Sequence, residues 1–244
     1  MAVARARPHE SVRTTRALLL KRIEYGEADL VLNLFTERYG RVSALARSAR
    51  RSTRRFGGAL EPMHTLEVGL EERPKSELFM LREARIAVPR LGLIEDLARL
   101  EAAGKALSWA RRAAPPRTPE PELWDALSAL LDELTRRDQP IEPKRLIAAA
   151  GLRILATLGW GLDFERCVRC GKECPPEQVA LVDPQHGGLV CRACGGARLR
   201  LDGPARERLA RAAATGDAEA LTTDDAELAS DLVDAVLKAH AGLE

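Results

Sequence analysis

The sequence predicts an α+β protein in which a five-stranded β-barrel precedes an α-helical domain that carries a four-cysteine element. Three observations lead to this prediction. Short apolar runs that alternate with polar residues fill positions 14–86, Ala/Leu-rich segments with charged faces fill most of the chain beyond residue 90, and two CxxC pairs interrupt those segments. A hydrophobic period of two residues is typical of strands, whereas a period near 3.6 is typical of helices.

Five short strands are expected in the N-terminal part. The evidence for them is apolar runs at 17–20, 28–35 and 78–86 and alternation at 42–46 and 65–71. Tyr39-Gly40 marks a turn between the second and the third strand. Five strands within about seventy residues favour a small barrel, and the oligonucleotide-binding OB-fold is the commonest five-stranded kind.

Helices are expected at 91–112, 122–137, 143–158, about 204–214 and 224–240. Prolines separate the first three, and Gly159 follows the third, as expected at helix boundaries. These limits divide the chain into four parts. They are the OB-fold at 1–86, the first helical part at 87–163, the cysteine element at 164–198 and the second helical part at 199–244.

The cysteine spacing is the most specific chemical signal in the chain. The pattern is C-V-R-C, twenty residues, then C-R-A-C, and its four candidate ligands are Cys167, Cys170, Cys191 and Cys194. Two CxxC pairs at this separation can complete a tetrahedral Zn²⁺ site. Four thiolates close the coordination shell, so one structural zinc ion is expected and not a catalytic one.

Cys174 is the remaining cysteine. It could replace Cys170 in a C-x6-C arrangement, but a CxxC pair has the better ligand geometry, so Cys174 is expected to stay outside the site. His186 is a weaker rival ligand and is expected to be a polar residue of the turn at 183–188.

The net charge of +2 conceals an asymmetry along the chain. Residues 1–60 hold thirteen Lys/Arg against five Asp/Glu, a net of +8, so the remainder carries −6. The basic end indicates a nucleic-acid surface, and the acidic remainder indicates contacts with proteins. No apolar stretch approaches the roughly 18 residues of a membrane span, and the N-terminus lacks an apolar signal region. We therefore expect a cytoplasmic protein, in whose reducing surroundings cysteines bind metal more readily than they form disulfides.

The densest basic cluster runs from Arg47 to Gly58, with no acidic residue between Glu37 and Glu61. Such a loop can follow a phosphate backbone, and this interpretation is favoured over a merely solvated loop. Phe56 could stack on a base or anchor the loop to the core. The anchoring role is favoured. Basic residues beside the strands could extend the surface. The candidate DNA-binding residues are Lys21, Arg22, Arg38, Arg41, Arg47, Arg50, Arg51, Arg54, Arg55 and Phe56.

Common catalytic motifs are missing from the sequence. It contains no G-x-x-x-x-G-K-[ST], G-x-G-x-x-G or G-x-S-x-G motif. It also lacks the dense Asp/Glu/His cluster of a two-metal nuclease. The chain is therefore expected not to be an enzyme. A metal-dependent deaminase or nuclease with this sequence would lack its catalytic residues.

Four segments, taken in their order and spacing, resemble bacterial RecO, a family of recombination mediators in DNA repair. The segments are Tyr25–Val42, Arg55–Pro62, Leu152–Trp160 and Gly187–Gly195. The resemblance covers nearly the whole chain. One departure is Arg47-Ser48, where members of the family often have Gly after a Lys, and it concerns the geometry of the loop and not its charge.

The resemblance implies an N-terminal OB-fold, a helical domain and a zinc element that serves as scaffold. It also implies binding of single- and double-stranded DNA, annealing of complementary strands, and a partnership with RecR. With RecR, such proteins help RecA to load on DNA coated by single-strand-binding protein (SSB), whose acidic C-terminal tail they contact, and RecF is an indirect partner. The alternative is a zinc-containing nucleic-acid-binding adaptor that does not anneal strands.

Overall fold

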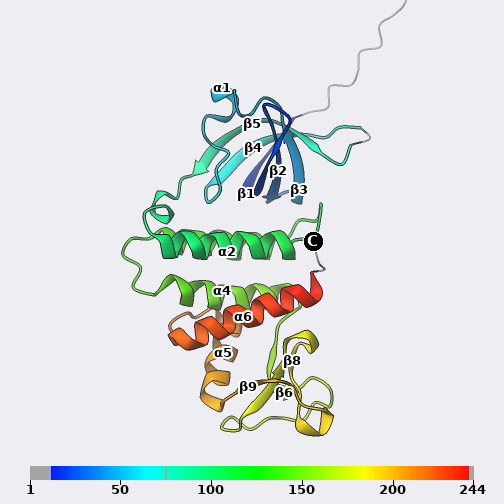
Figure 1. Ribbon diagram of the computed structural model, residues 1–244, viewed down its shortest axis with the longest axis vertical. Coiled ribbons are helices and arrows are strands. Elements are labelled where there is room, and N and C mark those ends of the chain that lie inside the picture. The colour runs from blue at the N-terminus through cyan, green and yellow to red at the C-terminus, as the bar shows by residue number, and fades with distance from the viewer. Residues whose placement is uncertain (1–11, 75, 242–244) are drawn as a thin grey trace, which may run out of the picture. The chain divides into compact units, whose positions relative to one another are not determined.

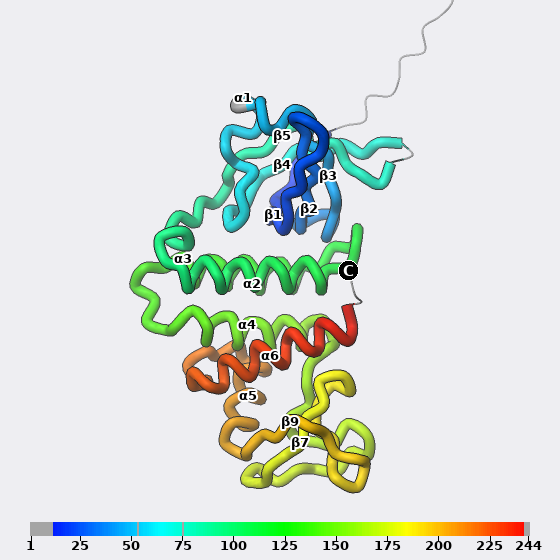
Figure 2. The backbone as a smooth tube through the Cα atoms, viewed as in Figure 1, coloured from blue at the N-terminus to red at the C-terminus, as the bar shows by residue number. Residues whose placement is uncertain are grey.

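The computed structural model describes residues 12–74 and 76–241, and the structural statements below concern these residues. The chain forms two compact units. The first holds the chain up to Pro89 together with Pro115–Pro119, and the second holds Arg90–Ala114 and the chain from Glu120 onwards. Figures 1 and 2 show a β-barrel in the first unit, and helices with a small sheet in the second.

Five strands close the barrel: β1 (Arg13–Tyr25), β2 (Asp29–Thr36), β3 (Gly40–Ala46), β4 (Thr65–Glu71) and β5 (Phe79–Val88). Their order is β1-β2-β3-β5-β4, and β4 pairs back to β1. Only the pairing of β3 with β5 is parallel in this sheet. A five-stranded barrel of this kind is an OB-fold, so the predicted fold is confirmed.

Alternate residues of the strands fill the barrel, as the sequence pattern predicts. Leu30, Leu32 and Leu34 of β2 and Val42 and Ala44 of β3 all lie in its core. The strand β1 extends well beyond the apolar run at 17–20, because residues 21–25 continue as a hairpin arm that pairs with residues 29–33. All five residues of this extension are exposed and three of them are charged, so the apolar run at 17–20 did not indicate it.

Five helices build the second unit: α2 (Leu97–Ala113), α3 (Pro121–Thr135), α4 (Pro143–Thr157), α5 (Gly203–Thr215) and α6 (Thr223–His240). The central helix α4 packs against the other four. Gly151 of α4 lets the ring of Trp109 approach, because a Cβ atom there would lie 2.4 Å from the ring. None of the described helices is long and apolar enough to cross a membrane.

A four-stranded sheet holds the cysteine element. Its strands are β6 (Asp163–Cys167), β7 (Ala180–Asp183), β8 (Gly188–Leu189) and β9 (Leu199–Leu201), in the order β6-β8-β7-β9. The helix α5 contacts β6. Because these strands have at most five residues, hydrogen bonds and a small apolar core alone hold the sheet weakly.

A buried carboxylate starts the helix α6. Thr222 and Asp225 form a capping box, and Arg208 of α5 donates two hydrogen bonds to Asp225 at 2.7 and 3.0 Å. Burial raises the pKa of Asp225, but hydrogen bonds from Arg208 and Thr222 outweigh it and hold that pKa below its ordinary value. Asp225 therefore stabilises the fold above about pH 4, and this contribution is lost as the pH falls through its lowered pKa.

Replacing Asp225 with Asn is expected to lower the free energy of unfolding by about 2 kcal/mol at pH 7, because a buried, charge-assisted pair is lost. The difference in the free energy of unfolding between this variant and the unsubstituted protein should shrink as the pH falls below about 4, where the native carboxylate also becomes protonated. Urea unfolding curves between pH 7 and pH 3 measure both effects. Asp224→Asn, an exposed neighbour in the same turn, is the control, and an equal loss in both variants would contradict the assignment.

Candidate metal centre and nucleic-acid surface

The four cysteines of the two CxxC pairs come together at one end of the small sheet. Cys167 ends β6, Cys170 follows in the next turn, and Cys191 and Cys194 lie at the two ends of a short 3-10 turn. Their four Sγ atoms lie within 4.8 Å of one another, and those of Cys170 and Cys191 are 3.8 Å apart. Zn–S bonds of about 2.3 Å in a tetrahedron place sulfurs about 3.8 Å apart. The cluster therefore has the donor set and the spacing of a four-thiolate metal site.

Backbone hydrogen bonds prepare one sulfur for ligation. The N–H group of Cys191 donates to Sγ of Cys167 at 3.3 Å. This bond is the largest cause that lowers the pKa of Cys167 to about 6. Contacts with the sulfurs of Cys191 and Cys170 raise the pKa of Cys194 to about 12. Four thiolates this close repel one another, so a divalent cation is the natural means of holding all four ionised.

Two glycines shape the turns that present the sulfurs. Gly171 and Gly195 follow the two CxxC pairs with φ angles of +71° and +104°, which residues with a Cβ atom rarely adopt. Arg169 joins the turns, since its Nη1 donates to the carbonyl of Cys194 at 3.2 Å. Its Nη2 lies 3.2 Å from Nε2 of His186, whose Nδ1 is 2.7 Å from a carboxylate oxygen of Asp183. His186 thus belongs to this polar chain and lies outside the cysteine cluster.

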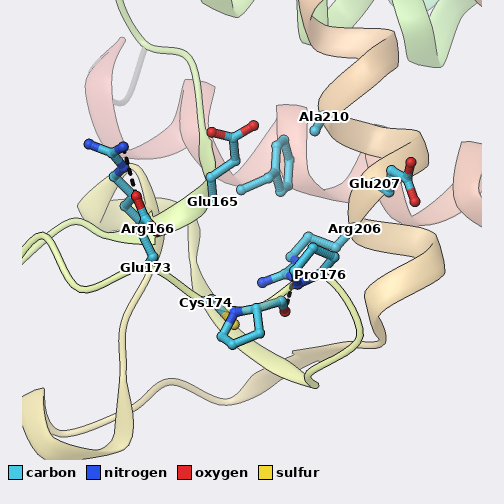
Figure 3. A pocket seen from close by; sticks show the side chains of 10 residues that line it. Glu165, Arg166, Glu173, Cys174, Pro176, Arg206, Glu207 and Ala210 are labelled. Carbon is cyan, nitrogen blue, oxygen red and sulfur yellow. Dashed lines mark hydrogen bonds and ion pairs between the residues drawn. The ribbon is translucent and has the colours of Figure 1, made fainter.

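Cys174 lies in a different place. It lines a cavity of 640 Å³ between the cysteine element and α5, together with Phe164, Pro176 and Arg206. Figure 3 shows Cys174, Pro176 and Arg206 around the opening. Arg206 donates a hydrogen bond to the carbonyl of Pro175. Cys174 is absent from the group of clustered cysteines.

The arginine loop (residues 47–55) follows β3 and ends in the short helix α1 (Thr53–Phe56), which the sequence did not indicate. All five of its arginines are exposed. The hairpin arm of β1 and β2 supports the loop: the N–H of Ser48 donates to Oδ1 of Asp29 at 2.7 Å, and that of Arg50 donates to the carbonyl of Ala28 at 3.1 Å. The backbone of the loop is therefore tied to the barrel.

Acidic residues distant in sequence lie beside part of this loop. Arg50 pairs with Glu24 at 3.3 Å and Arg51 with Glu27 at 3.7 Å. All four side chains are well exposed, so these pairs are weak and leave the guanidinium groups able to exchange partners. The remaining loop arginines, Arg47, Arg54 and Arg55, have no acidic partner among the described residues.

A groove of 400 Å³ lies between the arginine loop and the hairpin arm. Its cationic lining consists of Arg22, Arg50 and Arg51, and its acidic lining consists of Glu24 and Glu61. Arg22 is paired with Glu61 at 2.6 Å. The structure thus brings Arg22 next to the loop, as an extended basic surface requires.

Phe56 requires a correction. Its exposed fraction is 2%, and it belongs to the core of the barrel. The guanidinium of Arg55 lies over its ring at 5.1 Å from the centroid. Phe56 therefore anchors the loop, which is the interpretation favoured from the sequence, and its candidacy as a base-stacking residue is wrong.

Two further candidates lie away from the loop. Arg38 is in the turn between β2 and β3 and Arg41 is the second residue of β3, whereas Arg47 follows the end of that strand. Six residue steps along β3 correspond to about 20 Å. Sequence reasoning missed Arg117, an exposed residue whose N–H donates to the carbonyl of Arg41 at 2.9 Å. It enters this unit from 76 positions further on, and no local pattern signals that contact.

Comparisons with known proteins agree with one another over most of the chain. The family model for the N-terminal part of recombination protein O matches residues 11–90, and the model for its C-terminal part matches residues 94–244. The DNA repair protein RecO of Anaeromyxobacter sp. (strain Fw109-5) is 38% identical over 178 residues, which cover 72% of this chain and 68% of that protein.

Other relatives show similar agreement. The DNA repair protein RecO of Geobacter metallireducens is 36% identical over 166 residues, 68% of this chain and 66% of that protein. The DNA repair protein RecO of Myxococcus xanthus is 35% identical over 178 residues, 73% of this chain and 70% of that protein.

Proposed function

The chain belongs to the RecO family of DNA repair proteins, and on that premise we propose that it anneals complementary DNA strands on the basic surface of its OB-fold. The arginine loop carries this proposal. It presents five exposed arginines above a groove on the barrel, three of them without an acidic partner among the described residues. Single- and double-stranded DNA would both bind through their phosphates.

The physical problem in annealing is kinetic. Pairing releases about 1.4 kcal/mol per base-pair step, so no nucleotide hydrolysis is needed to drive it. Two polyanions nevertheless repel each other, and SSB covers the bases. A surface that neutralises phosphates and leaves base edges free lowers this barrier. Arg22 and the arginines of the loop would supply that charge.

The cysteine cluster has a separate, structural role in this proposal. Cys167, Cys170, Cys191 and Cys194 would hold one Zn²⁺, which closes the small sheet by linking its two CxxC turns. With four thiolate ligands the ion has no open position for substrate. We therefore propose a protein that acts by binding and not by catalysis.

Partner contacts follow from the family. We propose that the chain works with RecR in the bacterial cytoplasm, contacts the acidic C-terminal tail of SSB and helps RecA to load on SSB-coated single strands, with RecF acting indirectly. Cationic side chains of the chain are the natural contacts for an acidic tail.

Annealing of two SSB-coated complementary oligonucleotides, followed by fluorescence without ATP, tests the proposal. We expect the protein to accelerate annealing, and more strongly at low salt because phosphate contacts are screened by ions. A variant with the loop arginines replaced should lose this acceleration. Binding of DNA without acceleration would instead favour the adaptor that does not anneal strands, and absence of binding would refute both.

A further inference from the structure

Tyr25 is the exposed aromatic residue of the chain. All nine Phe, Tyr and Trp residues lie in the described part, and the other eight are buried or half-buried. Tyr25 is 60% exposed. Its ring makes no hydrogen bond, ring contact or cation–π contact with any described residue. The fold therefore gains little from this ring, which leaves a large, flat apolar surface in water.

The residue ends β1 on the outer face of the hairpin arm. Residues alternate between the two faces of a strand, so Lys21 and Ile23 share this face with Tyr25, while Arg22 and Glu24 face the groove. Ile23 is 42% exposed. An aromatic ring and an aliphatic side chain thus lie two positions apart on one open face.

Cations lie on both sides of this apolar pair. Lys21 is about 13 Å along the strand from Tyr25, at about 3.3 Å per residue. On the other side, β2 pairs Asp29 with Tyr25, and continuing the register of β2 and β3 places Arg47 beside Asp29 on the same outer face. Neither Lys21 nor Arg47 has an acidic partner among the described residues.

The arginine loop is also fixed next to this face. Asp29, the cross-strand partner of Tyr25, accepts the hydrogen bond from the N–H of Ser48 at 2.7 Å. Glu24 of β1 and Glu27 of the turn pair with loop arginines. A DNA strand whose phosphates contact the loop arginines would therefore pass close to the ring of Tyr25.

From this arrangement we infer that the outer face of the hairpin arm is a base subsite, formed by Tyr25 and Ile23, for an unpaired nucleobase of single-stranded DNA. The inference rests on the proposed function, because the neighbouring cations hold the DNA strand. The ring stacks on the base, Ile23 supports its edge, and Lys21 and Arg47 contact the phosphates on either side. The faces of bases in a duplex are occupied by their neighbours, so duplex DNA can use the cations but not the ring.

The consequence is a division of labour between single- and double-strand binding. Phosphate contacts do not depend on whether a base is paired. Base–aromatic stacking requires an unpaired base and tolerates any sequence. Tyr25 would therefore raise affinity for single strands selectively, which favours capture of the strands that are to be paired and release of the duplex that forms.

The test compares Tyr25→Ala and Tyr25→Phe in the full chain, with fluorescence anisotropy on a single-stranded oligonucleotide, on the same strand with abasic positions, and on a blunt duplex. Tyr25→Ala should weaken binding of the intact single strand by about 5- to 140-fold, the range of one lost stacking contact. Binding of the abasic strand and of the duplex should change less than about twofold, since neither offers a base to the ring. Tyr25→Phe should retain the unsubstituted affinity. Ile86→Ala, at a residue of β5 that is 41% exposed, serves as the control.

Two results would overturn the inference: equal weakening on all three DNAs, or no weakening on the intact single strand. If loss of the loop arginines still weakens binding in either case, phosphate binding by the arginine loop stands and only the base subsite is wrong. If the unsubstituted protein binds none of the three DNAs, the proposed function itself has failed. Circular dichroism of each variant shows that the barrel remains folded.

Discussion

Cys191→Ser is expected to abolish binding of the proposed zinc ion and to unfold residues 163–201, while the barrel remains folded. The strands of this sheet are short, and the cysteines of both turns meet at a single point. In small zinc domains the binding of the metal supplies about 10–16 kcal/mol of apparent folding free energy, so its loss exceeds what such a sheet can provide by other means. A strong chelator should have the same effect on the unsubstituted protein.

Cys174→Ser is the matched control for this experiment. It removes a thiol from the same segment, but Cys174 lies outside the cluster. Zinc content by elemental analysis should be one ion per chain in the control and none in Cys191→Ser. In Cys191→Ser, the rate of amide hydrogen exchange should rise across residues 163–201 and stay unchanged across residues 13–88. Retention of zinc in Cys191→Ser, or its loss in Cys174→Ser, would contradict the ligand assignment.

Local constraints explain why the cysteine cluster could be predicted from sequence. A CxxC turn brings two sulfurs together whatever the rest of the chain does, and only the meeting of the two pairs depends on the fold. The alternation of β2 and β4 is equally local, because one buried face imposes a period of two. These features needed no knowledge of distant contacts.

Prediction failed where the answer depends on distant residues. Sequence reasoning favoured Phe56 as an anchor of the loop, which its burial bears out, but it did not find the exposed ring of Tyr25, about 30 positions earlier. The same hairpin brings Glu24 and Glu27 next to the loop. The segment between Glu37 and Glu61 contains no acidic residue, but in the folded chain acidic side chains lie beside it. The exposed end of β1 continues past the apolar run at 17–20, so that run did not indicate the length of the strand.

Changing Arg50, Arg51, Arg54 and Arg55 together to Gln is expected to weaken binding of DNA strongly and to reduce its dependence on salt. Contacts with about six phosphates give a slope of log K against log salt near −4 for single strands, since each contributes about −0.7. Removing four charges should leave a slope near −1.4. Arg50 and Arg51 should contribute to this effect although both are ion-paired with glutamates. Each substitution lowers the local charge by one unit whether or not a carboxylate is nearby.

Gln is chosen because it keeps much of the length of the side chain and its hydrogen-bonding capacity while it removes the charge. The control variant changes four exposed arginines of the second unit to Gln: Arg136, Arg137, Arg198 and Arg211. It has the same net charge as the test variant. A slope that falls equally in both variants would mean that only total charge matters, and a fall in the control alone would place the DNA on the second unit. A selective fall in the test variant, with Phe56 still buried and the melting temperature preserved, would establish that the arginine loop holds the phosphates.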